Sequence, residues 1–451
     1  MFGWEFPPHI SGGLGTACYG LTRGLAYHGV EVIFVVPKAY GDEDQSAVRL
    51  VGSDQVPVRK REYHFTPETA GQLEQMSPEA IREMVYIEVG SKLVPYLSPE
   101  EFEQYIQERI KSGDTTWLEQ FVRKAPETKV YSEEIGTFTF TGKYGPDLMQ
   151  EVSNYSIVGA EIALDEQFDV IHAHDWLTYP AGIAARNASG KPLVVHVHAT
   201  EFDRSGENYN NLVYDIEKSG MMAADLVVTV SNLTRNIVIN RYGIDPAKIV
   251  TVYNAVEPAR ENKMPEVHKN IDEKVVTFLG RITYQKGPEY FLDAANKVLK
   301  HTSNVRFVMA GSGDLLRKMI RYAARLGITD KFHFTDFLKG PDVDYMFALS
   351  DVYVMPSVSE PFGISPLEAM HSNVPVIISK QSGVSEILKH AIKIDFWDVD
   401  AMADAIYGLI SYNSLSAMFR EHGKGEVEKM KWEESARKLK ELYLKLTNTI
   451  R

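Results

Sequence analysis

Short apolar runs rich in β-branched residues alternate with helical stretches along almost the whole chain. Such alternation produces parallel sheets covered by helices, because each helix carries the chain back to begin the next strand in the same direction. We therefore expect an α/β fold with doubly wound parallel sheets. The predicted strands are 31–37, 84–89, 168–174, 192–198, 226–231 and 248–254 in the first half, and 275–282, 304–311, 331–337, 351–357, 374–379 and 391–396 in the second.

The chain has 451 residues, more than one hydrophobic core usually organises, so we expect more than one domain. Residues 255–274 are charged, contain proline and lack apolar periodicity, which is typical of a linker. We predict one doubly wound domain over 1–258, with a polar, helical insertion at about 91–150, and a second over 259–430, facing it across a cleft. Residues 431–451 form an amphipathic helix that we expect to pack back on the domains. Its apolar positions are Trp432, Ala436, Leu439, Leu442 and Leu446.

The net charge argues against some binding partners, and the cysteine content indicates the cellular compartment. The formal net charge of −13 argues against a nucleic-acid partner and against docking on an anionic membrane. Cys18 is the single cysteine, which fits a reducing compartment. With no signal peptide and no apolar run near the roughly 20 residues of a membrane span, we expect a cytoplasmic protein without a transmembrane segment. The opening MFGWEFPP gives only half a strand before its prolines, so we expect a short first strand and a truncated or misassigned start.

The stretch SEPFGISPLEAM, residues 359–370, carries two glutamates, Glu360 and Glu368. Ser365, followed by Pro366 and Glu368, predicts a helix that begins near 365 with a capping box, in which Glu368 bonds back to the Ser365 amide. Glu360 lies before this helix at the end of a predicted strand, where open α/β sheets place ligand contacts. Capping alone explains Glu368 as well as a ligand does, but it does not explain Glu360.

A second loop with charged residues, GRITYQKG (280–287), follows the first strand of the second half. Arg281 and Lys286 lie five residues apart, and two cations at a strand end suit a diphosphate. Two solvated surface charges are the slightly favoured alternative for this loop taken alone. Its position at the same sheet edge as Glu360 and Glu368 strengthens the binding interpretation.

Two glycine-containing loops give weaker signals. In HISGGLG, Gly12 and Gly13 let the backbone approach a phosphate or sugar, although a purely structural turn is as good an explanation. In MAGSGDLL, Gly311 and Gly313 end a strand and Asp314 is expected to cap a helix, which suggests a nucleotide-facing turn.

Two strand ends of the first half carry paired histidines, in HAHDW and HVHATEFD. Residues two apart on a strand share a face, so His172 with His174, and His196 with His198, could each bind zinc. We expect no metal, because both strands are predicted to be buried and no cysteine or compact set of carboxylates completes a site. His198 ends its strand and is better placed as a residue facing the cleft.

The combination of GGLG, HAHDW, a histidine ending the fifth strand, GRxxxxKG and EPFGxxPLEA resembles retaining glycosyltransferases with two Rossmann-like domains, the GT-B fold. The chain looks most similar to glycosyltransferase family 4 and the neighbouring glycogen and starch synthases. The resemblance covers most of the chain and is weakest from 45 to 150. It implies a hexosyltransferase that uses a nucleoside-diphosphate sugar.

The resemblance assigns donor-binding roles in the second domain. Arg281 and Lys286 match cations that hold the donor diphosphate and stabilise the leaving group, and Glu360 matches a glutamate that contacts the donor sugar. Glu368 matches a ribose-binding glutamate, so capping and ligand binding can belong to one residue. The remaining matched donor-binding positions are Phe362, Gly363, Ile364 and Ser365, and we add Gly311, from the expected nucleotide-facing turn, to the donor-binding residues.

The resemblance also assigns roles in the first domain. Gly12 and Gly13 match a loop that closes on the phosphates. His198 matches a histidine near the reacting carbon. Asp175 belongs to a motif shared with the glucan synthases, on the acceptor side.

Two departures bear on the acceptor. Glucan synthases usually carry lysine where this chain has Ser11, and often replace the glutamate kept here as Glu368, so both positions favour family 4. HAHDW and the extended first domain look synthase-like, and the leading expectation is glucose transfer from UDP- or ADP-glucose to an α-glucan, as in glycogen biosynthesis, without cofactor or metal. The alternatives are a family 4 transferase acting on a small sugar or cell-surface glycan, and a non-catalytic sugar-nucleotide-binding protein.

Overall fold

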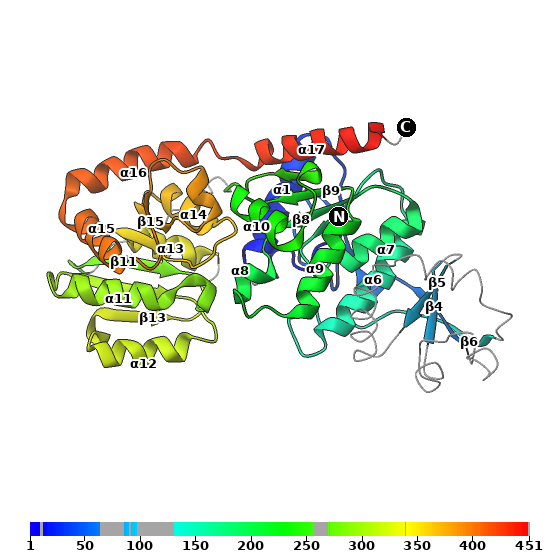
Figure 1. Ribbon diagram of the computed structural model, residues 1–451, viewed down its shortest axis with the longest axis horizontal. Helices are drawn as coiled ribbons and strands as arrows, with labels where there is room; N and C mark the ends of the chain where they lie inside the picture. The colour runs from blue at the N-terminus through cyan, green and yellow to red at the C-terminus, as the bar shows by residue number, and fades with distance from the viewer. Residues whose placement is uncertain are drawn as a thin grey trace.

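The computed structural model describes residues 1–9, 12–63, 85–89, 92–96, 130–256, 269, 271–338 and 340–449. The two halves of the chain form two lobes, with the C-terminal half on the left of Figure 1 and the N-terminal half on the right. Each lobe is built on a parallel sheet, as the alternation of strands and helices predicts. None of the helices within the described ranges is both long and apolar enough to cross a bilayer.

Six strands and the opening residues form the sheet of the N-terminal lobe. The strands are β1 (Ile33–Val36), β2 (Arg49–Gly52), β7 (Ile171–His174), β8 (Leu193–Val197), β9 (Leu226–Thr229) and β10 (Ile249–Thr251). Four of them run in the order β10-β9-β8-β7, and Phe2 joins them to the β1-β2 pair by parallel bridges to Ala173 and Val35. The Phe2 amide donates to the His172 carbonyl at 2.8 Å. The short first strand is thus confirmed: it is a single bridging residue, Phe2, with a partner on either side.

Six parallel strands form the sheet of the C-terminal lobe. They are β11 (Lys274–Leu279), β12 (Val305–Ala310), β13 (Phe332–Thr335), β14 (Val352–Met355), β15 (Val376–Ser379) and β16 (Ile392–Ile394). Their order, β13-β12-β11-β14-β15-β16, is that of a Rossmann sheet, with the strand order reversing between β11 and β14. Ligands of such sheets bind beyond the carboxyl ends of these central strands, where the loops carrying Arg281 and Glu360 begin.

A third sheet is antiparallel and departs from the prediction. Its strands are β3 (Val58–Tyr63), β4 (Val85–Val89), β5 (Lys92–Tyr96) and β6 (Val130–Gly136), in the order β5-β4-β3-β6. The predicted strand 84–89 exists as β4, but it pairs antiparallel with β3 and β5. The helical insertion predicted for 91–150 is wrong for β5 and β6, and residues 97–129 lie outside the described residues. The overlooked signal is Gly90-Ser91 between two apolar runs, a sequence typical of a two-residue hairpin.

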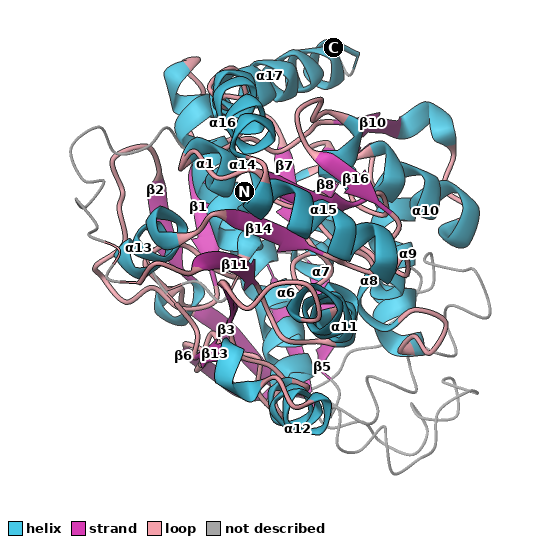
Figure 2. Ribbon diagram, turned by 90° about the vertical axis from the view of Figure 1, so that its left-hand side faces the viewer, coloured by secondary structure: helices cyan, strands magenta, loops and turns pink. Residues whose placement is uncertain are grey.

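Helices cover the parallel sheets, and Figure 2 shows them on both sides of β11 and β14. The N-terminal lobe contains α1 (Gly13–Tyr27), α6 (Leu148–Asp165), α7 (Tyr179–Ser189), α8 (Glu201–Ser205), α9 (Asn211–Ala223) and α10 (Asn232–Tyr242). The C-terminal lobe contains α11 (Pro288–Leu299), α12 (Leu316–Leu326), α13 (Pro341–Leu349), α14 (Ser365–His371), α15 (Val399–Ser411) and α16 (Asn413–Val427). On α11, the buried Phe291 packs between Phe278 and Phe307 of the sheet, with ring centroids 5.7 and 5.8 Å away. Burying one such ring contributes about 1.5–3 kcal/mol.

The last helix, α17 (Trp432–Thr449), leaves the C-terminal lobe and packs on the N-terminal lobe, as predicted. Its buried residues Trp432, Ala436 and Leu439 join the core cluster that includes α1. Lys440 Nζ donates to the His28 carbonyl at 2.6 Å, just beyond the end of α1. The helix therefore ties the end of the chain to its beginning and spans the two lobes.

Replacing Gly20 with alanine tests this helix contact. A Cβ at Gly20 would lie 2.3 Å from the Trp432 ring, so Gly20→Ala should lower the free energy of unfolding by about 1–3 kcal/mol through overpacking. Gly425 in α16 is the matched control, because a Cβ there meets no atom of the described chain within 4 Å. Gly425→Ala should raise stability by about 0.5–1 kcal/mol, the helix-propensity difference. Denaturant unfolding measures both, and equal effects would contradict the close packing of α17 on α1.

Candidate active site

The predicted site residues of the two halves lie on the edges by which the lobes face each other. Ser359, which follows β14, donates its hydroxyl hydrogen to Asp203 Oδ1 of α8 at 2.5 Å. Arg281, which follows β11, lies near enough to Asp175, which follows β7, for its charge to act on that carboxyl. Residues more than a hundred positions apart are thus gathered at the interface between the lobes.

Lys286 and Glu360 form an ion pair at the carboxyl ends of β11 and β14. Lys286 Nζ contacts Glu360 Oε2, which also accepts from the Ser357 hydroxyl at 3.3 Å. The side chains are only 20% and 8% exposed, so the prediction of a solvated charge is wrong for Lys286. Arg281 is exposed, as expected if its charge were a solvated surface charge. An ammonium has three donors, so Lys286 can hold Glu360 and still donate to a phosphate.

A glycine turn positions this ion pair. Gly287 has a φ of +64°, and a Cβ there would lie 2.1 Å from the Pro356 carbonyl oxygen. Only glycine allows this approach, which brings the residues before it against the end of β14. The Val358 amide donates to the Gln285 carbonyl at 2.9 Å and fixes the two loops together.

The predicted glycine turn after β12 has a structural explanation. Gly311 has a φ of +141°, and a Cβ there would lie 1.9 Å from the Gly280 carbonyl oxygen. Gly311 therefore lets the ends of β11 and β12 pack closely. The prediction that Asp314 caps the next helix is wrong. The N-cap of α12 is Leu315, and the helix begins one residue later than a cap at Asp314 would place it.

The capping box predicted for Ser365 and Glu368 is also wrong. Ile364 is the N-cap of α14 and already has helical angles, φ −78° and ψ −38°, so Ser365 lies inside the first turn, where it cannot cap. Ser365 instead hydrogen-bonds the Tyr353 side chain of β14. Because no side chain of the described residues caps the start of α14, the Glu368 carboxyl can bind a ligand instead. Burial, with a smaller contribution from Asp344, raises the pKa of Glu368 to about 7.

Glu368→Gln tests the raised pKa of the Glu368 carboxyl. Because folding raises the pKa of Glu368 above its value in the unfolded chain, its contribution to stability is fully present below about pH 4.5 and is lost as the pH rises through about 7. The stability of Glu368→Gln relative to the unsubstituted chain should therefore increase between pH 5 and pH 8. Denaturant unfolding at several pH values measures this difference. A stability difference that does not change with pH would contradict the raised pKa of Glu368.

His198 and Asp175 form the facing edge of the N-terminal lobe. Asp175 Oδ1 accepts from the backbone amides of His198 at 2.8 Å and Ala199 at 3.3 Å, so it fastens the ends of β7 and β8 together. Burial raises the pKa of Asp175 to about 6, opposed by the nearby Arg204 and, less strongly, by Arg281. Asp175 is thus a positioning residue for the His198 backbone.

The four predicted histidines share one face of β7 and β8, as the spacing indicates. The rings of His172 and His174 stack with centroids 4.3 Å apart, and those of His196 and His198 do the same. His174 Nδ1 lies 3.0 Å from His198 Nε2, within hydrogen-bonding distance. His172 and His196 lie deeper, and His198 is only partly buried. Desolvation lowers the pKa of His198 to about 3, so the ring is neutral at ordinary pH.

The glycine loop of the N-terminal lobe begins α1. Gly12 is the N-cap and Gly13 the first helical residue. A Cβ on either one would meet nothing within 4 Å among the described residues, so packing alone does not demand glycine there. Open space at both positions is consistent with a loop that a ligand approaches.

Sequence reasoning missed several polar residues at this interface. Arg204 of α8 forms a 3.1 Å ion pair with Glu201 and a second with Glu217. Tyr144 hydrogen-bonds Glu5, and the charges of Asp175 and Arg281 act on its hydroxyl. The only available signal was TEFD (200–203), whose Thr200 and Asp203 form the capping box of α8.

Comparison with known proteins identifies the family. Residues 259–426 match the glycosyl transferases group 1, and residues 147–260 match glycosyltransferase family 4. An uncharacterised glycosyltransferase of Methanocaldococcus jannaschii is 31% identical over 296 residues, which cover 62% of this chain and 75% of that protein. The alpha-maltose-1-phosphate synthase of Mycolicibacterium smegmatis is 26% identical over 314 residues, which cover 62% of this chain and 80% of that protein.

A solved structure shares the whole fold. The catalytic domain of starch synthase IV from Arabidopsis thaliana, bound to ADP and acarbose, superposes with a TM-score of 0.66 at 16% identity, and the match covers 99% of this chain and 98% of that one. The superposition supports two facing Rossmann-like domains, the GT-B fold. The chain therefore belongs to the glycosyltransferases, as a family 4-like member with the GT-B fold.

Proposed function

We propose that the chain is a retaining hexosyltransferase that moves glucose from a nucleoside-diphosphate sugar to an α-glucan. The observation that carries the proposal is the position of Arg281 and the Lys286–Glu360 pair on one lobe, opposite Asp175 and His198 on the other. Two cations and a carboxylate on one edge suit a diphosphate joined to a sugar. The neutral His198 faces them from the other edge.

The proposed chemistry is electrostatic. As the bond between sugar and diphosphate breaks, negative charge grows on the leaving phosphate, and the cations Arg281 and Lys286 stabilise that charge. Glu360, already held by Lys286 and Ser357, accepts a hydrogen bond from a donor-sugar hydroxyl and fixes the sugar. Arg281 supplies a planar fork for two phosphate oxygens, whereas Lys286 supplies a point charge.

The proposed donor is UDP- or ADP-glucose, and the proposed acceptor is an α-glucan. The structural relative was solved with ADP and acarbose, and one sequence relative is named alpha-maltose-1-phosphate synthase, which supports glucosyl chemistry. Ser11, in place of lysine, and the retained Glu368 favour the alternative, a family 4 transferase acting on a small sugar or cell-surface glycan. We place the reaction in the cytoplasm, since a single cysteine fits a reducing compartment.

A donor and acceptor screen tests the proposal. The protein is incubated with glucose, galactose or mannose linked to UDP, ADP or GDP. Each donor is tested alone, with glycogen and with maltose, and release of the nucleoside diphosphate is measured. We expect release with one glucose donor, strongly increased by glycogen, and reduced by about 10²–10³-fold in Lys286→Ala. Release that only maltose stimulates would favour the small-sugar alternative. Binding of a sugar nucleotide without any release would indicate the non-catalytic binding protein.

A further inference from the structure

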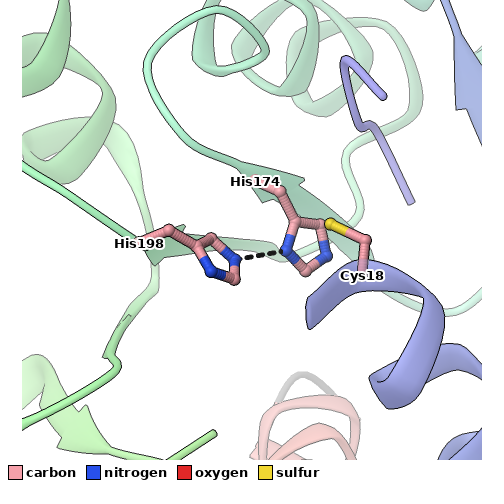
Figure 3. Close-up of side chains that lie close together, drawn as sticks. All are labelled: Cys18, His174 and His198. Carbon is pink, nitrogen blue, oxygen red and sulfur yellow. Dashed lines mark hydrogen bonds between the residues drawn. The ribbon is translucent and has the colours of Figure 1, made fainter. Parts of the chain in front are cut away.

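Three metal-binding side chains from separate elements converge beside the proposed site. Cys18 extends from α1, His174 ends β7 and His198 follows β8, and Figure 3 shows the three close together. One ligand atom from each lies within 4.8 Å of the others. No metal is expected from the sequence, because both strands are predicted to be buried and no cysteine or compact set of carboxylates completes a site. The fold supplies a cysteine from a helix more than 150 positions earlier.

The geometry of this cluster suits a tetrahedral soft cation. Zinc binds histidine nitrogen at about 2.0–2.1 Å and cysteine sulfur at about 2.3 Å, so its ligand atoms lie about 3.3–3.7 Å from one another. The facing nitrogens of His174 and His198 are 3.0 Å apart, close to that spacing. The Cys18 sulfur lies within 4.8 Å of the two histidine ligand atoms and has to move closer to them to bind the same ion.

Unpaired atoms and local charge point the same way. His174 Nε2 and both ring nitrogens of His196 are buried without a hydrogen-bond partner among the described residues; they are not the facing nitrogens of His174 and His198, but they show that the described protein groups do not satisfy the histidine stack. Burial, and less strongly the charges of Asp175 and Glu5, raise the pKa of the Cys18 thiol well above its ordinary value, so the thiol is neutral without an ion, while the same carboxylates favour a cation beside it. An imidazole that rotates to bind a metal ion can give up its present contacts with the other stacked histidines in exchange for the bond to the ion.

We propose that Cys18, His174 and His198 bind Zn²⁺ or a similarly soft divalent cation, and that its binding inhibits the enzyme by withdrawing His198 from the donor sugar. Three protein ligands leave the fourth position of a tetrahedral ion open to water at the interface between the lobes. Binding releases the thiol proton of Cys18 to solvent, because the thiolate is the ligand. The inhibitory effect rests on the proposed function, but metal binding itself does not.

Two other groups in the described chain are poorer sites. His172, His174 and His196 are all fully buried, with no ligand at the interface through which an ion could enter. His9, Asp42 and Glu43 are more exposed, and the Glu43 carboxylate is already occupied by the amides of Tyr40 and Gly41. Of these three groups, the cysteine-containing one combines a thiol with a histidine that is partly accessible.

Cobalt absorption tests binding without any assay of activity. Co²⁺ added to the metal-free protein should give the near-ultraviolet band of a cobalt–thiolate bond, which Zn²⁺ then removes by displacement. Because Cys18 is the single cysteine, a band can come only from this site. The band should be absent in Cys18→Ala, and also in Cys18→Ser should the alanine variant fold poorly. It should be unchanged in Asp42→Asn, which alters the exposed group.

Measurement of enzyme activity with added Zn²⁺ tests the proposed inhibition. Zn²⁺ should suppress glycosyl transfer, a chelator should restore it, and Cys18→Ala should need at least about tenfold more Zn²⁺ for the same suppression. Absence of the cobalt–thiolate band in the unsubstituted protein would overturn the proposal, as would equal Zn²⁺ inhibition of Cys18→Ala. If no donor supports turnover, the proposed function fails while the cobalt measurement still decides whether the metal binds.

Discussion

Lys286→Ala should lower turnover by about 10²–10³-fold, the loss expected when one electrostatic stabiliser of the leaving group is removed. It should also destabilise the protein, because it leaves the buried carboxylate of Glu360 without its cation. Removing one partner of a buried ion pair costs about 3–5 kcal/mol, and the partial exposure of Lys286 should reduce this to about 1–3 kcal/mol. Steady-state kinetics and denaturant unfolding measure the two effects separately.

A double variant separates catalysis from stability. Lys286→Ala with Glu360→Gln removes both charges, so it should recover much of the stability that Lys286→Ala loses. Its turnover should stay low, because the cation and the sugar-binding carboxylate are both gone. Near-normal turnover in Lys286→Ala would rule out the diphosphate role. Loss of turnover that recovers together with stability would reduce Lys286 to a structural residue.

His198→Ala should lower turnover by about 10²-fold or more, comparable to the loss of one positioned polar group, while leaving nucleotide affinity nearly unchanged. The reason is that the proposed nucleotide contacts lie on the C-terminal lobe, whereas His198 lies on the N-terminal lobe. Calorimetric titration with a nucleoside diphosphate measures affinity, and steady-state kinetics measures turnover. A parallel fall in affinity and turnover would contradict this division between the lobes.

The protonation state of His198 gives an independent check. Desolvation lowers the pKa of His198 to about 3, so the ring stays neutral between pH 5 and pH 8 and should add no limb to the pH–rate profile. His198→Gln, which keeps a neutral hydrogen-bonding group, should retain more turnover than His198→Ala. A limb near pH 6.5 that disappears in His198→Gln would show that the charged imidazole takes part instead.

The parallel sheets could be predicted from the sequence because each strand carries its own signal. The runs 275–282 and 351–357 are short, apolar and followed by helical stretches, and they became β11 and β14, the neighbouring central strands. Strand order then brings the loops after them together, which explains why Arg281 and Glu360 could be placed on one edge without coordinates.

The features that could not be predicted from the sequence depend mostly on contacts between residues that are far apart in the chain. The burial of Lys286 against Glu360 joins residues 74 positions apart, and Cys18 meets His174 only because α1 packs beside β7 and β8. The capping box of Ser365 failed for a local reason, because the preceding Ile364 already takes helical angles. The hairpin of β4 and β5 was marked by Gly90-Ser91, a signal present in the sequence but not used.

The structure of the chain with an intact or hydrolysed nucleoside-diphosphate glucose tests the central claim most directly. The account predicts that the diphosphate lies against Arg281 and Lys286, the ribose against Glu368, and the sugar or its vacated position between Glu360 and His198. A diphosphate bound on the N-terminal lobe, or one that leaves Lys286 and Arg281 untouched, would contradict it.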